Sequence, residues 1–124
     1  MAGARARSPG PRPVHVETTV ATRDDAASMA AKVLRARLAA CVLTAQVSSR
    51  YWWKGKLEEA NEMLVVFKTT SARAAKLSAR ILQLHPYEVP YLRVERMDRV
   101  PAAYRTWLAK ETAPRRPRVR RASR

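Results

Sequence analysis

The residues of this chain that could do chemistry are few, and no familiar catalytic set joins them. Cys41 is the only cysteine, His15 and His85 are the only histidines, and there are three glycines. There is no Ser-His-Asp pattern, no glycine-rich phosphate loop and no Cys-x-x-Cys pair. His15 and Cys41 could act as a nucleophilic pair only if the fold brought them together. We therefore predict a protein that binds and does not catalyse.

The densest chemical feature is the aromatic run 51–53 (Tyr-Trp-Trp), which leads directly into 54–56 (Lys-Gly-Lys). Adjacent residues of a strand point to opposite faces. We therefore expect one of Trp52 and Trp53 to pack within the subunit and the other at a subunit interface. The alternative is an aromatic cage for a cationic ligand. The two lysines are expected to be solvated turn charges.

The formal net charge of +15 is concentrated at the two ends of the chain. Nine arginines and no acidic residue lie in 1–12 and 113–124, which are also rich in Pro, Ala and Ser. Such segments cannot bury enough apolar surface to offset the entropy of ordering, so we predict two disordered basic tails. The folded domain is then 13–112, and it is only mildly basic.

Compartment is indicated by three features of the sequence. We find no apolar run long enough for a signal peptide or for a membrane span. The single cysteine excludes an intramolecular disulfide framework, which favours a reducing environment. We expect a cytoplasmic globular protein, since 47% of the residues are hydrophobic and can form a core.

These residues are positioned by alternating strands and helices. Apolar residues at every second position predict a strand over 14–20. Thr22 with Asp25 resembles a capping box, and the apolar face that follows predicts a helix ending near Ala39. Alternation resumes over 41–53 and predicts a long strand that passes through the aromatic run.

The second half of the sheet begins at Lys54-Gly55, which predicts a two-residue hairpin turn because glycine takes the positive φ that such turns need. The return strand includes 63–67 (Met-Leu-Val-Val-Phe), which does not alternate. A continuous apolar run in an antiparallel sheet indicates cover on both faces.

The remaining elements complete an α+β fold. Ser71 is expected to cap a second helix, which Pro86 ends. A strand over 89–97 follows, and then a short helix over 101–110 with Pro101 in its first turn. This order predicts a ferredoxin-like split βαβ-βαβ sandwich with a short C-terminal helix. Two helices cover only one face of the sheet, so we predict a homo-oligomer that buries the other face.

Five motifs occur in a fixed order along the chain: Leu38-Ala39-Ala40-Cys41, Tyr51-Trp52-Trp53-Lys54-Gly55-Lys56, Phe67-Lys68-Thr69-Thr70, His85-Pro86-Tyr87-Glu88-Val89-Pro90, and Tyr104 with Trp107. In this order they resemble the motifs of the CutA family, the divalent-ion tolerance proteins. The resemblance runs from Val14 to about Leu108 and leaves out both tails. It implies a ferredoxin-like fold, a trimer packed sheet against sheet, a cytoplasmic bacterial or organellar setting and a role in divalent-ion tolerance.

The resemblance also implies a metal site. Some family members bind copper or other divalent ions through a cysteine, a glutamate and a histidine. In this chain the cysteine position holds Thr18 and the histidine position holds Leu84, whereas Glu62 matches. A copper site needs several soft or imidazole donors. His85 is one residue away, so we name Glu62 and His85 as candidate ligands of a divalent cation such as copper.

Lys68 and Tyr87 are further polar residues of the family motifs near strand and helix ends, and we name them as candidates for a ligand cleft between subunits. Tyr91 stands where the family usually has an acid, so the ligand preference is expected to differ. The simpler expectation for Cys41 is a small buried residue at the start of a strand, and for His85 a bond to backbone at a helix end.

Two other functions stay open at this point. The six arginines of 113–124 become 18 in a trimer, which would support salt-dependent binding to nucleic acid or another anionic surface. The other alternative is a non-catalytic trimerisation scaffold.

Overall fold

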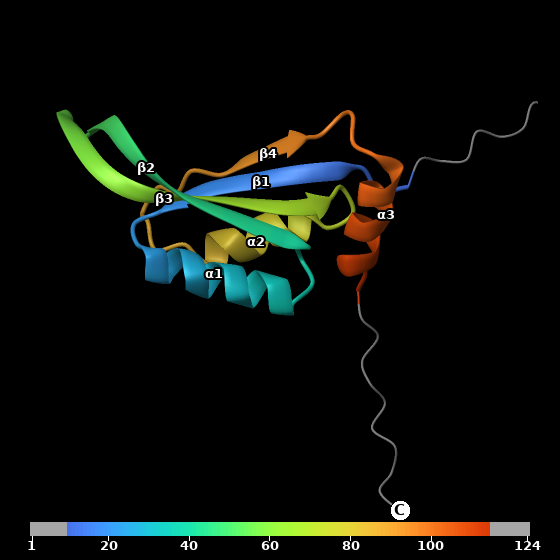
Figure 1. The fold of residues 1–124 in the computed structure, drawn as a ribbon. Helices are drawn as coiled ribbons and strands as arrows, with labels where there is room; N and C mark the ends of the chain where they lie inside the picture. The colour runs from blue at the N-terminus through green and yellow to red at the C-terminus, as the bar shows by residue number, and fades with distance from the viewer. Residues whose placement is uncertain (1–9, 115–124) are drawn as a thin grey trace, which may run out of the picture.

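The computed structural model describes residues 10–114, so nearly all of the two predicted tails lies outside it. The types and order of the elements agree with the prediction, and the fold is the ferredoxin-like α+β sandwich (Figure 1). In chain order they are β1 (Pro13–Val20), α1 (Arg23–Arg35), β2 (Cys41–Trp53), β3 (Lys56–Thr70), α2 (Ala74–Leu84), β4 (Arg93–Arg96) and α3 (Ala102–Glu111).

The strands form one antiparallel sheet in the order β2-β3-β1-β4. α1 and α2 lie together on one face of this sheet, and α3 lies at one end of it (Figure 1). No helix in residues 10–114 combines the length and the apolarity that a membrane span needs. The face of the sheet that α1 and α2 leave uncovered is called the open face below.

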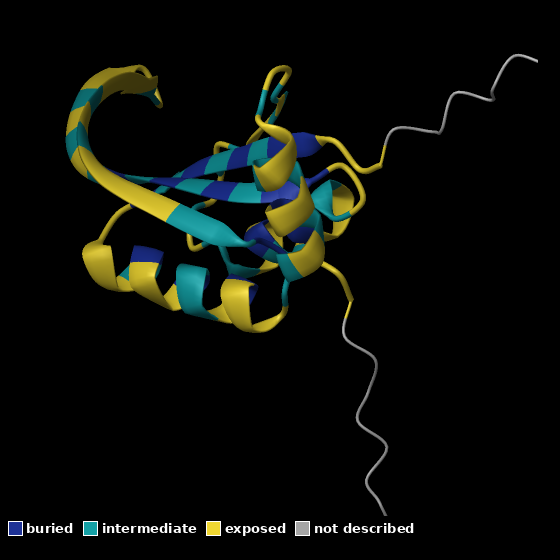
Figure 2. Ribbon diagram, turned by 45° about the vertical axis from the view of Figure 1, so that its right-hand side comes forward, coloured by how far each residue is buried: buried dark blue, intermediate teal, exposed yellow. Residues whose placement is uncertain are grey.

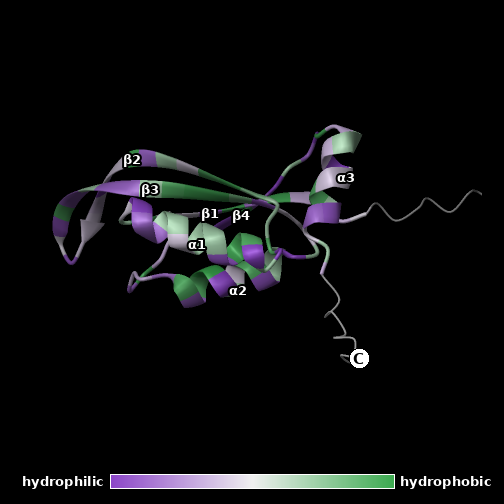
Figure 3. Ribbon diagram, turned by 60° about the horizontal axis from the view of Figure 1, so that its bottom comes forward, coloured by the Kyte–Doolittle hydropathy of each residue, from purple (hydrophilic) through white to green (hydrophobic). Residues whose placement is uncertain are grey.

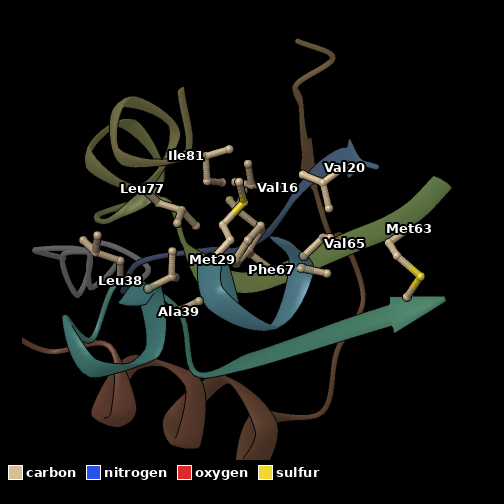
Figure 4. Close-up of a cluster of buried hydrophobic side chains, with 13 residues drawn as sticks. Val16, Val20, Met29, Leu38, Ala39, Met63, Val65, Phe67, Leu77 and Ile81 are labelled. Atoms are coloured by element: carbon tan, nitrogen blue, oxygen red, sulfur yellow. The ribbon is translucent and has the colours of Figure 1, made fainter. Parts of the chain in front are cut away.

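The core fills the space between the helix pair and the sheet. Figure 4 shows Met29 of α1 and Leu77 and Ile81 of α2 pointing toward Val16 and Phe67 of the sheet. Val16, Phe67, Leu77 and Ile81 have no exposed side-chain surface. α1 and α2 each present an apolar face to the sheet because their apolar residues recur at helical spacing.

Residues 63–67 place apolar side chains on both faces of the sheet, as their lack of alternation predicted. Met63, Val65 and Phe67 are buried under the helices, whereas Leu64 and Val66 are half-buried on the open face. Hydropathy along β3 changes from hydrophobic within the sheet to more hydrophilic toward the hairpin turn (Figure 3). Leu43 of β2 lies beside Val66 on the open face and is 48% exposed.

β2 and β3 continue beyond the end of β1 as a two-stranded ribbon, called the arm (47–53 and 56–62). β1 pairs with β3 only from Met63 onward, so the arm strands pair only with each other. The arm bends away from the helix layer, and its residues are exposed or half-buried (Figures 1 and 2). Lys54 and Gly55 have φ of 49° and 78°, the geometry of the predicted two-residue turn.

α1 ends at Arg35 and not near Ala39, so that part of the prediction was wrong. Arg37 has φ of 58°, and the amides of Arg37 and Leu38 bond back to the carbonyls of Leu34 and Val33. This is a Schellman ending, which usually has glycine at the left-handed position. The reversal turns Leu38 and Ala39 into the core, where both are buried.

Two other expectations were wrong in detail. Ser71 does not cap α2, because the residue before the helix is Arg73 and it makes no side-chain cap. The Ser71 hydroxyl instead accepts from the Arg12 amide at 2.9 Å, and so ties down the start of β1. β4 is limited to Arg93–Arg96, and the preceding residues 85–92 form a loop. Pro90 has no amide hydrogen for a strand ladder.

Candidate functional site

A pocket of about 570 Å³ lies where the arm meets the loop 85–92. Its volume is in the range of small-molecule sites in proteins. Its walls combine residues that are far apart in the sequence, since the arm comes from β2 and β3 and the loop follows α2. It is lined by Thr19, Ser49, Tyr51, Trp52, Trp53, Glu62, Tyr87, Glu88, Val89 and Tyr91.

Glu62 and Tyr87 meet in this pocket. The Tyr87 hydroxyl donates to Glu62 Oε1 at 3.0 Å, which joins the loop to the base of the arm. Burial raises the pKa of Tyr87, and the hydrogen bond to the Glu62 carboxylate and the charge of that carboxylate raise it further. The phenol therefore remains a proton donor at neutral pH, and one Glu62 oxygen is permanently engaged.

His85 holds the loop in place through both of its ring nitrogens. Nδ1 accepts from the Tyr87 amide at 3.2 Å, so the ring proton is assigned to Nε2. Nε2 lies 2.9 Å from the Thr19 carbonyl and 3.0 Å from the Thr18 hydroxyl. The Thr18 hydroxyl in turn donates to the Tyr91 carbonyl at 2.7 Å. Neither ring nitrogen has a lone pair left for a metal ion.

A second tyrosine–carboxylate pair flanks the pocket. The Tyr91 hydroxyl donates to Glu17 Oε2 at 3.0 Å. Burial and the Glu17 carboxylate raise the pKa of Tyr91. Glu17 lies on the open face of β1, so the two pairs hold the loop 85–92 against two different strands.

The charge lining the pocket is negative. Glu62 and Glu88 are its ionisable acids, and none of its lining residues is Lys, Arg or His. At the hairpin turn next to the arm, Lys54 Nζ lies 5.6 Å from the centroid of the Trp53 ring. The pocket therefore suits a cation better than an anion.

Lys68 does not belong to this pocket, although it was named with Glu62, His85 and Tyr87. It lies six residues beyond Glu62 on β3, a rise of about 20 Å. It occupies a row across the open face in which Cys41, Lys68, His15 and Glu95 are paired on successive strands.

The same row separates His15 from Cys41. Their strands are not neighbours, because β3 lies between β1 and β2. Two strand spacings put the backbones of His15 and Cys41 about 10 Å apart, with Lys68 between them. The structure does not bring these two residues together as a nucleophilic pair. Burial and the charge of Lys68 lower the pKa of His15, whereas Glu95 and Glu17 act in the opposite direction.

The donor set in one chain does not fit a copper ion. In residues 10–114 no three His, Cys, Asp or Glu side chains are grouped closely enough to hold a metal. The hydroxyl of Thr18 is buried and already bonded, Leu84 has no donor, and both nitrogens of His85 are engaged. Glu62 is the one candidate ligand that keeps a carboxylate oxygen facing the pocket without a bond to Tyr87.

Several residues of the pocket were not predicted. Ser49 and Thr19 carried no sequence signal, and Glu88 was named only as a member of the motif 85–90, because the arm and the loop meet only in the folded chain. Tyr91 was noted as unusual, but its pairing with Glu17 was not foreseen. The most useful signal was the dense set of aromatic residues in 51–53 and 87–91.

Proteins of a known family are similar to this chain in sequence and in fold. A family model described as CutA1 divalent ion tolerance protein matches residues 14–111. The divalent-cation tolerance protein CutA of Thermotoga maritima is 33% identical over 93 residues, 75% of this chain and 92% of that protein. The protein of that name from Pyrococcus horikoshii is 36% identical over 97 residues, 78% of this chain and 95% of that protein.

Solved structures agree with the sequence comparison. The crystal structure of CutA1 from Pyrococcus horikoshii matches with a TM-score of 0.78 and 34% identity, over 81% of this chain and 98% of that chain. CutA from Synechococcus elongatus PCC7942 matches with a TM-score of 0.80 and 31% identity, over 83% and 92%. The names of these proteins describe tolerance or the family and no enzyme activity. The chain belongs to the CutA1 family of divalent ion tolerance proteins.

Proposed function

We propose that this protein acts in divalent-cation tolerance as a non-catalytic binding protein, and that its binding site is the pocket between the arm and the loop 85–92. Family membership supports the tolerance role. The binding site and the absence of catalysis go beyond family membership and are part of the proposal. We place the protein in the cytoplasm, in keeping with its sequence.

The observation that carries the binding proposal is the Glu62–Tyr87 pair at the pocket wall. Glu62 is half-buried, the Tyr87 hydroxyl bonds one of its carboxylate oxygens, and no Lys, Arg or His lines the pocket beside it. A cation in the pocket would supply the opposite charge. The hydrogen bond leaves the second carboxylate oxygen of Glu62 available for that cation.

The proposal includes a homotrimer, with each pocket in a cleft that a neighbouring subunit borders. The arm has no core of its own, and Trp52 and Leu57, which face each other across it, are 74% and 61% exposed. A two-stranded ribbon of this kind is at best marginally stable alone. Packing against another subunit would cover both side chains, and would also cover Leu43 on the open face.

A divalent ion such as copper belongs to this proposal only if neighbouring subunits supply ligands. One chain offers Glu62 and Glu88 in the pocket, which are oxygen donors, whereas copper prefers imidazole and sulfur donors. Calorimetry with Cu(II), Zn(II) and Mn(II) tests this on the intact protein. Equal binding by wild type, Glu62→Gln and His85→Ala would exclude both residues as ligands.

The tolerance role is tested by growth. A bacterial strain that lacks its own CutA protein is supplied with the wild-type chain, Glu62→Gln, or Asp98→Asn as a control on an exposed residue outside the pocket. We expect the wild type and Asp98→Asn to restore growth in excess divalent metal, and Glu62→Gln to fail at equal protein level. Full rescue by Glu62→Gln would contradict the assignment of the pocket.

The Arg-rich segment 113–124 supports a second candidate, electrostatic binding to nucleic acid or another anionic surface. Deletion of 113–124 and a DNA gel shift at two salt concentrations separate the two functions. Binding that is insensitive to the deletion would exclude this candidate. A trimer with an empty pocket and no DNA affinity would favour the scaffold instead.

A further inference from the structure

We propose that the pocket between the arm and the loop 85–92 binds an organic ammonium cation, with aromatic ring faces around the cation and a carboxylate beside it. The proposal rests on the proposed function, because it names the ligand class of the same pocket. It is carried by three features of that pocket: the rings, the charge and the lack of a metal donor set.

Aromatic side chains are concentrated in this pocket. Five of the eight aromatic residues in the chain line it. Strand alternation places Tyr51 and Trp53 on one face of the arm and Trp52 on the other. Tyr87 and Tyr91 approach from the loop that follows α2. The cage therefore has rings from two separate walls, Tyr51 and Trp53 on one side and Tyr87 and Tyr91 on the other.

One ring of the pocket, that of Trp53, already has a cation near it. The face of an aromatic ring is the negative part of its quadrupole, and a cation within about 6 Å of the centroid is stabilised. Lys54 Nζ occupies such a position at 5.6 Å from the Trp53 centroid. Lys54 does not line the pocket, so the other rings of the cage are not used by it.

The charge of the pocket selects a cation and disfavours other ligands. Glu62 lies on the same face of the arm as Tyr51 and Trp53, because all three share the alternation of the paired strands. Glu88 adds a second carboxylate at the loop. An anionic ligand would meet two carboxylates without a basic side chain to offset them.

A bare divalent ion suits these walls less well than an organic cation. Divalent ions require several oxygen ligands or retain their water. In the described part of the chain no three metal-binding side chains are grouped, and aromatic rings cannot replace a hydration shell of this strength. An alkylated ammonium is weakly hydrated and exposes apolar methyl groups, so it loses little on entering an aromatic pocket.

The loop wall of the cage is already positioned before a ligand arrives. His85 fixes the Tyr87 amide, Thr18 fixes the Tyr91 carbonyl, and the two phenols are tied to carboxylates. The ring of Tyr87 also packs edge-on against His85, with centroids 4.9 Å apart. A prearranged site avoids part of the ordering cost of binding.

The test compares tetramethylammonium with tert-butanol, a neutral molecule of similar shape. Binding to the intact protein is measured by calorimetry and by broadening of the ligand methyl NMR signal, at constant ionic strength. We expect saturable tetramethylammonium binding and at least about tenfold weaker tert-butanol binding. Trp53→Leu and Glu62→Gln should each weaken tetramethylammonium binding by about 5-fold to 30-fold.

Trp107→Leu is the matched control, because Trp107 lies on α3, outside the pocket, and is 41% exposed. Its affinity should stay within about twofold of the wild type. Equal affinity for tert-butanol, equal losses in Trp53→Leu and Trp107→Leu, or no tetramethylammonium binding to the wild type would each overturn the proposal. Loss of tolerance in Glu62→Gln without any ammonium binding would leave the proposed function standing. Ammonium binding together with full rescue by Glu62→Gln would support the ammonium site and contradict the role of the pocket in tolerance.

Discussion

The Tyr87 hydroxyl donates to Glu62 Oε1 at 3.0 Å, across 25 residues of sequence. Tyr87 comes from the loop after α2, and Glu62 from the first residue of β3 beyond the end of β1. This bond joins the loop to the base of the arm, and both residues line the pocket. It also connects the acid of the site to the loop that His85 holds against β1.

Removal of this hydroxyl should destabilise the protein in a way that depends on pH. Tyr87→Phe leaves the Glu62 carboxylate without its donor, so the free energy of unfolding at pH 7 should fall by about 1–2 kcal/mol. The folded pKa of Tyr87 lies above the ordinary value of 10.0. The stability due to the protonated phenol is therefore complete below pH 10 and is lost as the pH rises above it.

Urea unfolding of wild type and Tyr87→Phe between pH 8 and about pH 11 checks this. The gap between the two proteins should narrow above pH 10. Tyr91→Phe serves as a control, because Tyr91 is 43% exposed and its bond to Glu17 should contribute less. A gap that stays constant or widens with pH would contradict the assigned role of the Tyr87 proton.

His85 should matter for stability and not for metal affinity. His85→Ala removes the acceptor of the Tyr87 amide and the donor to Thr18 and Thr19, and should lower the free energy of unfolding by about 2 kcal/mol. Zn(II) and Cu(II) affinities, measured by calorimetry, should change by less than about twofold, since neither nitrogen is free. A large loss of metal affinity in a folded His85→Ala protein would show that the ring rearranges to bind metal.

His15 should make the stability of the protein depend on pH below neutrality. Burial and Lys68 lower its folded pKa below 6.5, so the unfolded chain takes up a proton first. The unfolded state then binds more protons, and stability falls as the pH drops below about 6.5. His15→Gln should remove that part of the acid loss. Urea unfolding of wild type and His15→Gln at pH 7.5 and about pH 5 checks this, and an equal acid loss in both proteins would contradict it.

Periodicity in the sequence predicted the helices and strands and their order along the chain, but not the pocket. Alternation located β1 and β2, helical spacing located α1 and α2, and Lys54-Gly55 located the turn, because each depends on neighbouring residues. The pocket depends instead on the bend of the arm and on bonds such as His85 to Thr18, which are 67 residues apart. No local pattern records such a bond.

The errors have the same origin. Arg37 ends α1 in a left-handed conformation that is usual for glycine, and its guanidinium bonds Glu111 of α3 at 2.7 Å. Ser71 resembles a helix cap, but the start of β1 takes its hydroxyl. In both cases the side chain bonds a segment that is distant in the sequence, which no local pattern records.

The open face should be the surface through which subunits associate. Leu43→Asp places a charge beside Val66 on that face, whereas Leu82→Asp places one on α2, and both leucines are 48% exposed. Light scattering at micromolar protein should give three subunits for the wild type and Leu82→Asp, and a smaller mass for Leu43→Asp. A monomeric wild type would exclude the trimer, and equal masses for all three would place the interface elsewhere.

At the end of α1, the cost of the positive φ of Arg37 can be compared with the stabilisation from its ion pair with Glu111. A non-glycine residue with positive φ costs about 1 kcal/mol, and the Arg37–Glu111 pair, at 30% and 33% exposure, returns less than about 1 kcal/mol. Arg37→Gly alone should therefore change the free energy of unfolding little. In a Glu111→Gln background the ion pair is absent and the guanidinium keeps only its 3.5 Å bond to the main-chain carbonyl of residue 111, so Arg37→Gly should stabilise the protein by about 1 kcal/mol. Urea unfolding of wild type, Arg37→Gly, Glu111→Gln and the double variant measures the cost of the positive φ and the contribution of the ion pair. Destabilisation by Arg37→Gly in the Glu111→Gln background would mean that the guanidinium makes further contacts that offset the strain.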